Sequence, residues 1–158
     1  MHGKGKGNSY EKRELRRDEP FYRDALRLRY TVFFEPHGLG PGVVQDELES
    51  SSRHFSLVQD DRLLAYARLT LFTSGVAKMS QMVVSPACRR QGLGSALLQW
   101  IIEVCQGEQV RTIELEARSE KIGFYTRHGF RCRGESYPSR RTGIPHVHME
   151  RILRDPKR

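Results

Sequence analysis

The sequence predicts a mixed α/β layer fold, and three observations carry that prediction. Two alternating runs, 54–59 and 63–72, flank Asp60-Asp61 and predict an antiparallel hairpin. An apolar run at 76–84 leads through a glycine-containing loop into a strongly periodic helical segment. A further strand-like run at 110–117 follows that helix, so these three elements are expected to form a right-handed crossover unit.

Apolar spacing and turn residues predict the remaining elements. Phe21, Ala25, Leu28 and Val32 share one face of a helix expected over 20–34. The other expected elements are a long Gly/Pro-rich loop at 35–45, the periodic helix at 93–105, a short helix from a Ser119 cap to His128 that ends at Gly129-Phe130, and a final strand at 146–153.

Length and composition fit one globular domain. The chain has 158 residues, of which 37% are hydrophobic and 29% are charged. We expect a disordered basic tail at 1–12 and a single domain over 13–158. The sequence has neither a membrane-spanning apolar run nor the apolar core of a signal peptide, so a cytoplasmic location is predicted. The formal net charge of +8 suits an anionic partner.

The stretch Arg89-Arg90-Gln91-Gly92-Leu93-Gly94-Ser95 is the most informative part of the chain. It joins the predicted strand at 76–84 to the periodic helix. The first N–H groups of a helix have no partner within it, and the positive end of the helix dipole lies there as well. The glycines let a phosphate approach the backbone, and the arginines add positive charge. This stretch therefore predicts a site for a phosphorylated ligand.

Other phosphate loops and metal sites are disfavoured by residue spacing. A Walker-type loop needs GxxxxGK[ST], which the sequence lacks. A dinucleotide fingerprint needs a third glycine where this chain has Leu97, and it belongs near the first strand of a parallel sheet rather than behind a hairpin. The three cysteines form no CxxC pair, and His146 and His148 share a strand face without a third ligand, so no metal is expected.

Two further segments accompany this loop. Gly123-Phe124-Tyr125-Thr126-Arg127-His128-Gly129-Phe130 lies downstream of it, and Gly143–Met149 lies near the end of the chain. With Met82-Val83-Val84 and Arg89-x-x-Gly92-x-Gly94, these segments resemble the GNAT superfamily of acyl-CoA N-acyltransferases, and specifically its small ElaA-type bacterial members. The resemblance covers about residues 13–153. It implies a mixed, mostly antiparallel central sheet of about six to seven strands, flanked by about four helices.

The resemblance also implies a reaction and a binding mode. Acetyl-CoA would donate its acetyl group to a primary amine by direct attack in a ternary complex, with its pyrophosphate on Arg89–Ser95. The pantetheine arm would pair with the backbone of Met82, Val83 and Val84, in a gap where this strand splays from 110–117. A backbone N–H near Val83 or Val84 would stabilise the oxyanion, and Tyr125 would serve the leaving thiolate.

The sequence departs from the family in two places. No carboxylate lies between Gly75 and Val84, where some members carry a glutamate base. Glu116 is our candidate base, with Glu114 on the same strand face. Arg118 stands where many members have a cofactor-binding asparagine, and it could bond the cofactor or face solvent. The alternatives for the base are Asp46, Glu47, His146 and a water relay.

Several functional alternatives stay open at this point. The loop at 35–45 and the carboxylates of Asp46, Glu47 and Glu49 beyond it fall in the family's acceptor region, where they could attract a cationic amine or simply be solvated. A non-catalytic acyl-CoA-binding module, acting through a protein partner, is the alternative function. Nucleic-acid binding is disfavoured because no aromatic-interleaved basic face is visible. A homodimer and several classes of amine acceptor remain compatible with the sequence.

Overall fold

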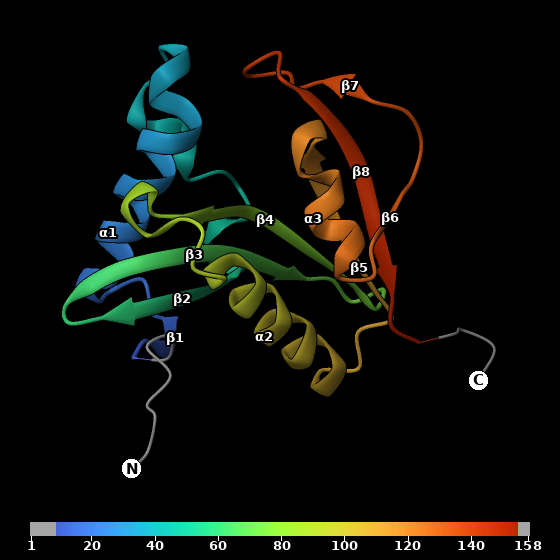
Figure 1. Ribbon diagram of the computed structural model, residues 1–158, viewed down its shortest axis with the longest axis horizontal. Helices are drawn as coiled ribbons and strands as arrows, with labels where there is room; N and C mark the ends of the chain where they lie inside the picture. Colours follow the sequence, from blue (N-terminus) through green and yellow to red (C-terminus); the bar gives the residue numbers. More distant parts are fainter. Residues whose placement is uncertain (1–8, 155–158) are drawn as a thin grey trace.

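One twisted sheet runs through the computed structural model, which describes residues 9–154 (Figure 1). The strand order is β1-β2-β3-β4-β5-β8-β6, and β7 pairs with β8. The predicted mixed, mostly antiparallel fold is confirmed, although the described residues form eight strands and three α-helices. The bounds are β1 (Glu11–Leu15), α1 (Pro20–Arg29), β2 (Arg53–Gln59), β3 (Arg62–Leu71), β4 (Val76–Val84), α2 (Leu93–Gly107), β5 (Thr112–Arg118), α3 (Ile122–Arg127), β6 (Arg131–Cys132), β7 (Tyr137–Pro138) and β8 (Pro145–Ile152).

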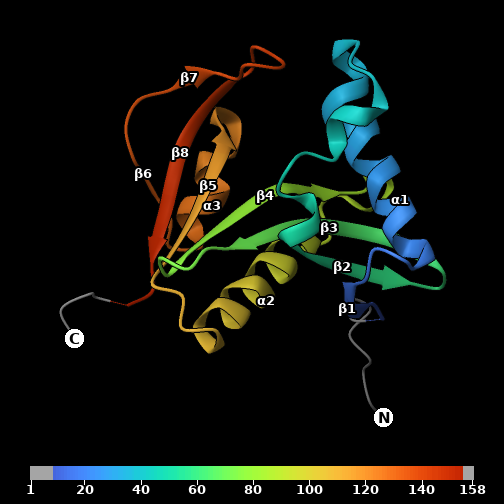
Figure 2. The ribbon, with the colours of Figure 1, turned by 180° about the vertical axis from the view of Figure 1, so that it is seen from behind.

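The two faces of the sheet carry different sets of side chains. Ala65, Ala67 and Leu69 of β3 belong to the large apolar core beneath α2 and α3. Tyr66 and Arg68 alternate with them and point to the opposite face, which α1 covers (Figure 2). The sheet therefore separates a cluster built on α2 and α3 from a more polar cluster built on α1.

The parallel strands β4 and β5 pair only at their beginnings. Val76–Lys78 pair with Thr112–Glu114, whereas β4 continues to Val84 and β5 to Arg118. Beyond these three pairs the strands diverge in a V, and α3 lies beside the opening (Figure 1). The predicted splay is thus present, and it leaves backbone groups in the second half of β4 without a partner on β5.

Local sequence signals explain the turns around this opening. Asp60 and Asp61 both have positive φ, at 46° and 60°, as the predicted tight hairpin between β2 and β3 requires. Gly129 ends α3 with φ at 84°, and the Phe130 N–H then bonds the Tyr125 carbonyl at 3.1 Å. This geometry confirms the predicted C-terminal cap, because glycine adopts the left-handed conformation without strain.

Three predictions about element ends need correction. The basic tail was expected over 1–12, but β1 already begins at Glu11; residues 1–8 of that predicted tail lie outside the described residues. Ser119 does not cap α3, because a short 3₁₀ turn intervenes and the helix begins at Ile122. The helix expected over 20–34 is α-helical only to Arg29 and continues as a π-helical turn to Phe34, a conformation that is frequent at functional sites.

Among residues 9–154, no helix combines the length and the apolar character needed to cross a lipid bilayer.

Candidate active site

The loop between β4 and α2 has the backbone geometry of an anion site. Arg90 and Gly92 both have positive φ, at 65° and 75°. The first hydrogen bond of α2 runs from the Ala96 N–H to the Gly92 carbonyl at 3.1 Å, so the N–H groups of 93–95 precede the helical ladder. Nothing lies within 4 Å of a Cβ placed on Gly92. A phosphate can therefore approach these N–H groups closely.

The seven loop residues divide between surface and interior. Arg89, Arg90, Gln91 and Gly92 are exposed, which leaves both guanidinium groups accessible to a ligand. Leu93 is buried within the core beneath α2 and α3. Gly94 and Ser95 are half-buried, and the Ser95 hydroxyl lies 3.0 Å from His128 Nε2. This contact fixes the end of α3 against the first turn of α2.

Met82, Val83 and Val84 line the open part of β4. The side chain of Val83 is buried on the α1 face, beside Tyr66. Met82 and Val84 pack on the opposite face, against the core beneath α2 and α3. Because β5 does not pair with this part of β4, its backbone groups on that edge are available to an extended ligand.

Tyr125 points from α3 to the same strand. Its hydroxyl lies 3.8 Å from the Met82 sulfur. Phe124 and Phe130 contact its ring edge-on, with centroid distances of 5.0 and 5.9 Å. Burial raises the pKa of the Tyr125 phenol to about 12, so the hydroxyl keeps its proton at neutral pH. It can thus donate a hydrogen bond or a proton at the opening between the strands.

Glu116 lies on the other face of β5, with several ionisable side chains. Its carboxylate is 3.8 Å from the Lys78 Nζ and 3.9 Å from the His148 Nδ1. Tyr137 stacks on His148 with a centroid distance of 4.8 Å, and burial and the Glu116 charge raise the pKa of the Tyr137 phenol to about 12. We call Lys78, Glu116, Tyr137 and His148 the Glu116 cluster.

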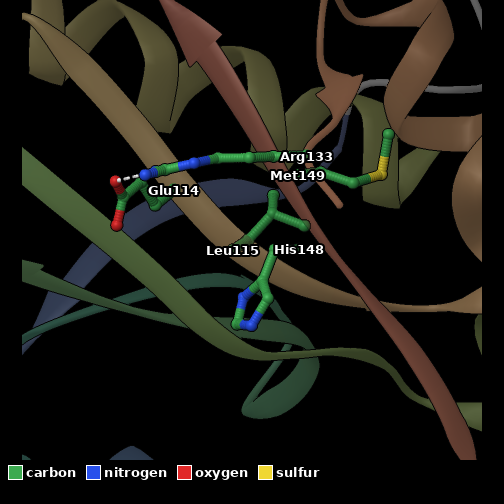
Figure 3. A pocket seen from close by; sticks show the side chains of 5 residues that line it. All are labelled: Glu114, Leu115, Arg133, His148 and Met149. Carbon is green, nitrogen blue, oxygen red and sulfur yellow. Dashed lines mark hydrogen bonds and ion pairs between the residues drawn. The ribbon is translucent and has the colours of Figure 1, made fainter. Parts of the chain in front are cut away.

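A cavity of about 310 Å³ adjoins this cluster. Its lining includes His148, Glu114 and Arg133, and the last two form an ion pair at 3.1 Å (Figure 3). His148 and Met149 project to opposite sides of β8. Glu114 is therefore held by a direct guanidinium contact, whereas the half-exposed Glu116 has only the longer contacts to Lys78 and His148 at 3.8 and 3.9 Å.

Arg118 does not lie on the Tyr125 side of the sheet. The preceding Ala117 packs into the core beneath α2 and α3, so alternation directs Arg118 to the α1 face. Its guanidinium lies 5.5 Å from the centre of the Phe33 ring. Arg141, from the turn between β7 and β8, donates to the Val43 carbonyl at 2.8 Å. Both arginines thus connect the β5–β8 part of the sheet to the segment that follows α1.

Two carboxylates that the sequence analysis considered for attracting a cationic amine, Asp46 and Glu49, form ion pairs with arginines instead. Asp46 accepts two hydrogen bonds from Arg68, at 2.8 and 3.0 Å. Glu49 is only 2% exposed and is bound by Arg29 and Arg68. Neither carboxylate is free to receive a cationic acceptor, since each already balances a buried guanidinium. Glu47 is exposed, and His146 Nδ1 lies 2.8 Å from the Ile144 carbonyl.

No three side chains of His, Cys, Asp or Glu within residues 9–154 are arranged to hold a metal ion.

A match to a protein-family model identifies the family to which this chain belongs. The acetyltransferase (GNAT) family model matches residues 13–130, which include the loop, the splayed strands and Tyr125. This chain belongs to the GNAT family. Among its GNAT relatives, protein ElaA of Escherichia coli K12 is 29% identical over 130 residues, which cover 80% of this chain and 84% of ElaA.

Solved GNAT structures have the same fold. An acyl-CoA N-acyltransferase from Pseudomonas aeruginosa has a TM-score of 0.76 at 26% identity, covering 90% of this chain and 98% of its own. A GNAT family acetyltransferase from Elizabethkingia anophelis, whose structure has acetyl-CoA bound, has a TM-score of 0.73 at 12% identity, covering 92% and 99%. GNAT membership supports acyl transfer from an acyl-CoA as the general activity.

Proposed function

We propose that this GNAT protein transfers an acetyl group from acetyl-CoA to a primary amine, by direct attack within a ternary complex. The observation that carries the proposal is the V-shaped opening between β4 and β5, with a loop of anion-site geometry after β4 and the Tyr125 hydroxyl beside Met82 of the open strand. The acetyl-CoA-bound neighbour has this fold, which supports acetyl-CoA as the donor.

The donor half of the site is proposed from backbone groups. Residues 89–95 would hold the pyrophosphate through the N–H groups at the start of α2 and the charges of Arg89 and Arg90. The unpaired edge of Met82–Val84 would take the pantetheine arm as an added strand. Since Arg118 lies on the α1 face against Phe33, its placement favours a role near the acceptor over a phosphate contact.

The chemistry requires two proton movements. The free amine nitrogen forms a bond to the thioester carbonyl carbon, and when the carbon–sulfur bond then breaks, the second proton lost from the nitrogen replaces the one that Tyr125 gives to the sulfur. Glu116 would accept the proton of the incoming ammonium, because its carboxylate is half-exposed on the face of β5 opposite the core beneath α2 and α3, where Lys78 and His148 already approach it. Tyr125 would give its proton to the departing sulfur, since its phenol is protonated and faces the opening. A backbone N–H near Val83 would stabilise the carbonyl oxygen.

A thiol-release assay with a panel of amines tests this proposal. Purified protein is mixed with acetyl-CoA and with peptide N-termini, lysine derivatives, polyamines, aminoglycosides or small amine metabolites. We expect free CoA thiol and an equal amount of acetylated amine for one class. Saturable acetyl-CoA binding without turnover on the whole panel would instead favour the non-catalytic acyl-CoA-binding module.

A further inference from the structure

β4 contains a bulge at the point where it leaves β5. Tyr66 pairs with Val83 and Arg68 with Ser80, so Gln81 and Met82 together oppose the single residue between Tyr66 and Arg68. Gln81 has a φ of 52°, in the left-handed region that a glutamine rarely adopts. Such a conformation persists only where the surrounding structure holds it.

The side chain of Gln81 is anchored at both of its polar atoms. Arg29 Nε donates to Gln81 Oε1 at 2.7 Å. Gln81 Nε2 donates to the Val44 carbonyl at 3.4 Å, and an Arg29 terminal nitrogen donates to the same carbonyl at 3.3 Å. Arg29, Gln81 and Val44 thus form a closed set of contacts. It joins α1, the bulge and the turn at Pro41–Val44.

Arg29 is itself held rigidly. Its side chain is 0% exposed, and its two terminal nitrogens donate to the two Glu49 oxygens at 2.8 and 2.7 Å. Its guanidinium also lies 4.7 Å from the centre of the Tyr66 ring. Glu49 accepts further bonds from Tyr22 and Arg68. Because rotation of Arg29 would leave buried charges unpaired, its Nε stays directed at Gln81.

We propose that Arg29, acting through Gln81, is a positioning residue for acyl transfer: it fixes the bulge in β4 and thereby the direction of the backbone N–H groups of Met82 and Val83. This inference rests on the proposed function, in which these N–H groups contact the acyl donor. A bulge rotates the backbone that follows it, so its loss turns those donors away from the opening. The same contacts hold the Pro41–Val44 turn against the bulge.

Substitutions at Gln81 separate the anchor from the backbone conformation. Gln81→Ala removes the anchor and keeps the strain of positive φ, and we expect kcat to fall about tenfold. Gln81→Gly also removes the anchor, but glycine adopts positive φ freely, so it should restore most of the lost kcat. The KM for acetyl-CoA should change less than kcat, because the phosphate loop is untouched. Gln99→Ala, on the exposed side of α2, is the matched control.

A double-variant cycle tests whether Arg29 acts through Gln81. Arg29→Lys keeps the charge beside Glu49 but cannot form the same fork and also bond Gln81. The combined Arg29→Lys and Gln81→Ala variant should have the kcat of the lower single variant, since both substitutions break the same hydrogen bond between Arg29 and Gln81. Multiplicative losses, or equal kcat in Gln81→Ala and Gln81→Gly, would overturn the inference. Thermal unfolding of each variant identifies any loss that reflects instability.

A crystal structure of Gln81→Ala provides a readout that does not depend on turnover. We expect β4 to lose the bulge in this variant and to keep it in Gln81→Gly. A bulge that persists unchanged in Gln81→Ala contradicts the inference, whether or not the enzyme is active. Absence of thiol release by the wild type on every amine contradicts the proposed function instead, so the two failures are distinguishable.

Discussion

The Tyr125 hydroxyl lies 3.8 Å from the Met82 sulfur, which brings α3 and β4 together across the opening between β4 and β5. The Tyr125 side chain has little freedom to leave this contact, because Phe124 and Phe130 pack against its ring and the His128–Ser95 contact holds α3 against α2. The phenol is therefore held near the loop at 89–95 and the splayed part of β4, where the proposed mechanism places the leaving sulfur of the donor.

Removal of the Tyr125 hydroxyl tests its proposed role as proton donor. Tyr125→Phe should lower kcat about a hundredfold while the affinity for acetyl-CoA is kept, because loss of a general acid affects the chemical step. Steady-state thiol release and calorimetric titration measure the two quantities. The fold should survive, since the hydroxyl's contact is with a thioether and the ring contacts remain.

Tyr10→Phe is a suitable control, because Tyr10 precedes β1 at the opposite edge of the sheet. If Tyr125→Phe has wild-type kcat, Tyr125 takes no part in the chemistry.

Two glutamates on one face of β5 provide a matched pair for the base. Glu116→Gln should lower kcat about a hundredfold, since an amide cannot accept the proton of the ammonium. Glu114→Gln should have nearly wild-type kcat, because the Glu114 carboxylate is engaged by Arg133. Steady-state kinetics of both variants checks this. Equal losses in the two variants, or none in Glu116→Gln, would remove Glu116 as the base.

The buried Glu49 carboxylate makes the free energy of unfolding depend on pH in the acidic range. Although burial opposes its ionisation, hydrogen bonds from Arg29, Tyr22 and Arg68 hold its pKa at about 2, below its usual 4.5. Folding lowers this pKa, so the stabilisation is complete above about pH 4.5 and is lost as the pH falls toward 2. It amounts to about 3 kcal/mol of unfolding free energy. The lowered pKa of buried His54 adds a loss of the same sign below 6.5.

A single hydroxyl tests this acid dependence without leaving a charge unpaired. Tyr22→Phe removes one donor to Glu49, so the Glu49 pKa in the folded state should rise toward 4.5, and the acid-dependent loss of stability should become smaller and end at a higher pH. Urea unfolding at a series of pH values measures the shift. Tyr30→Phe is the control, because Tyr30 donates to the uncharged Leu39 carbonyl. A Tyr22→Phe profile parallel to that of the wild type would contradict the assignment.

Local signals in the sequence predict the elements that carry the site. Alternation gives the β2–β3 hairpin, and the 3.6-residue period gives α2. The glycines give the loop at 89–95, whose conformation depends on residues close in sequence. The resemblance to GNAT enzymes adds the splay and Tyr125, and the structure has both where expected.

Contacts distant in sequence explain what the sequence could not predict. Arg29, Glu49, Arg68 and Gln81 meet only after α1, the turn at Glu49–Ser51, β3 and β4 have assembled, so the sequence left Glu49 as either an acceptor-site carboxylate or a solvated one. The alternation of apolar and polar residues does not predict the bulge at Gln81, because a polar glutamine also fits an otherwise regular strand pattern. The one usable signal was Arg68 inside the apolar strand β3, since a buried guanidinium needs a carboxylate partner.

Calorimetric titration with acetyl-CoA, applied to the wild type and to Gly92→Asp, tests the central claim most directly. Gly134→Asp is the matched control, because both glycines have positive φ and nothing within 4 Å of an added Cβ, and Gly134 lies away from the loop. We predict one-to-one binding to the wild type and to Gly134→Asp, and affinity weakened about a hundredfold or more in Gly92→Asp, whose carboxylate would repel the pyrophosphate. No binding to the wild type, or equal affinity in Gly92→Asp, would contradict the account.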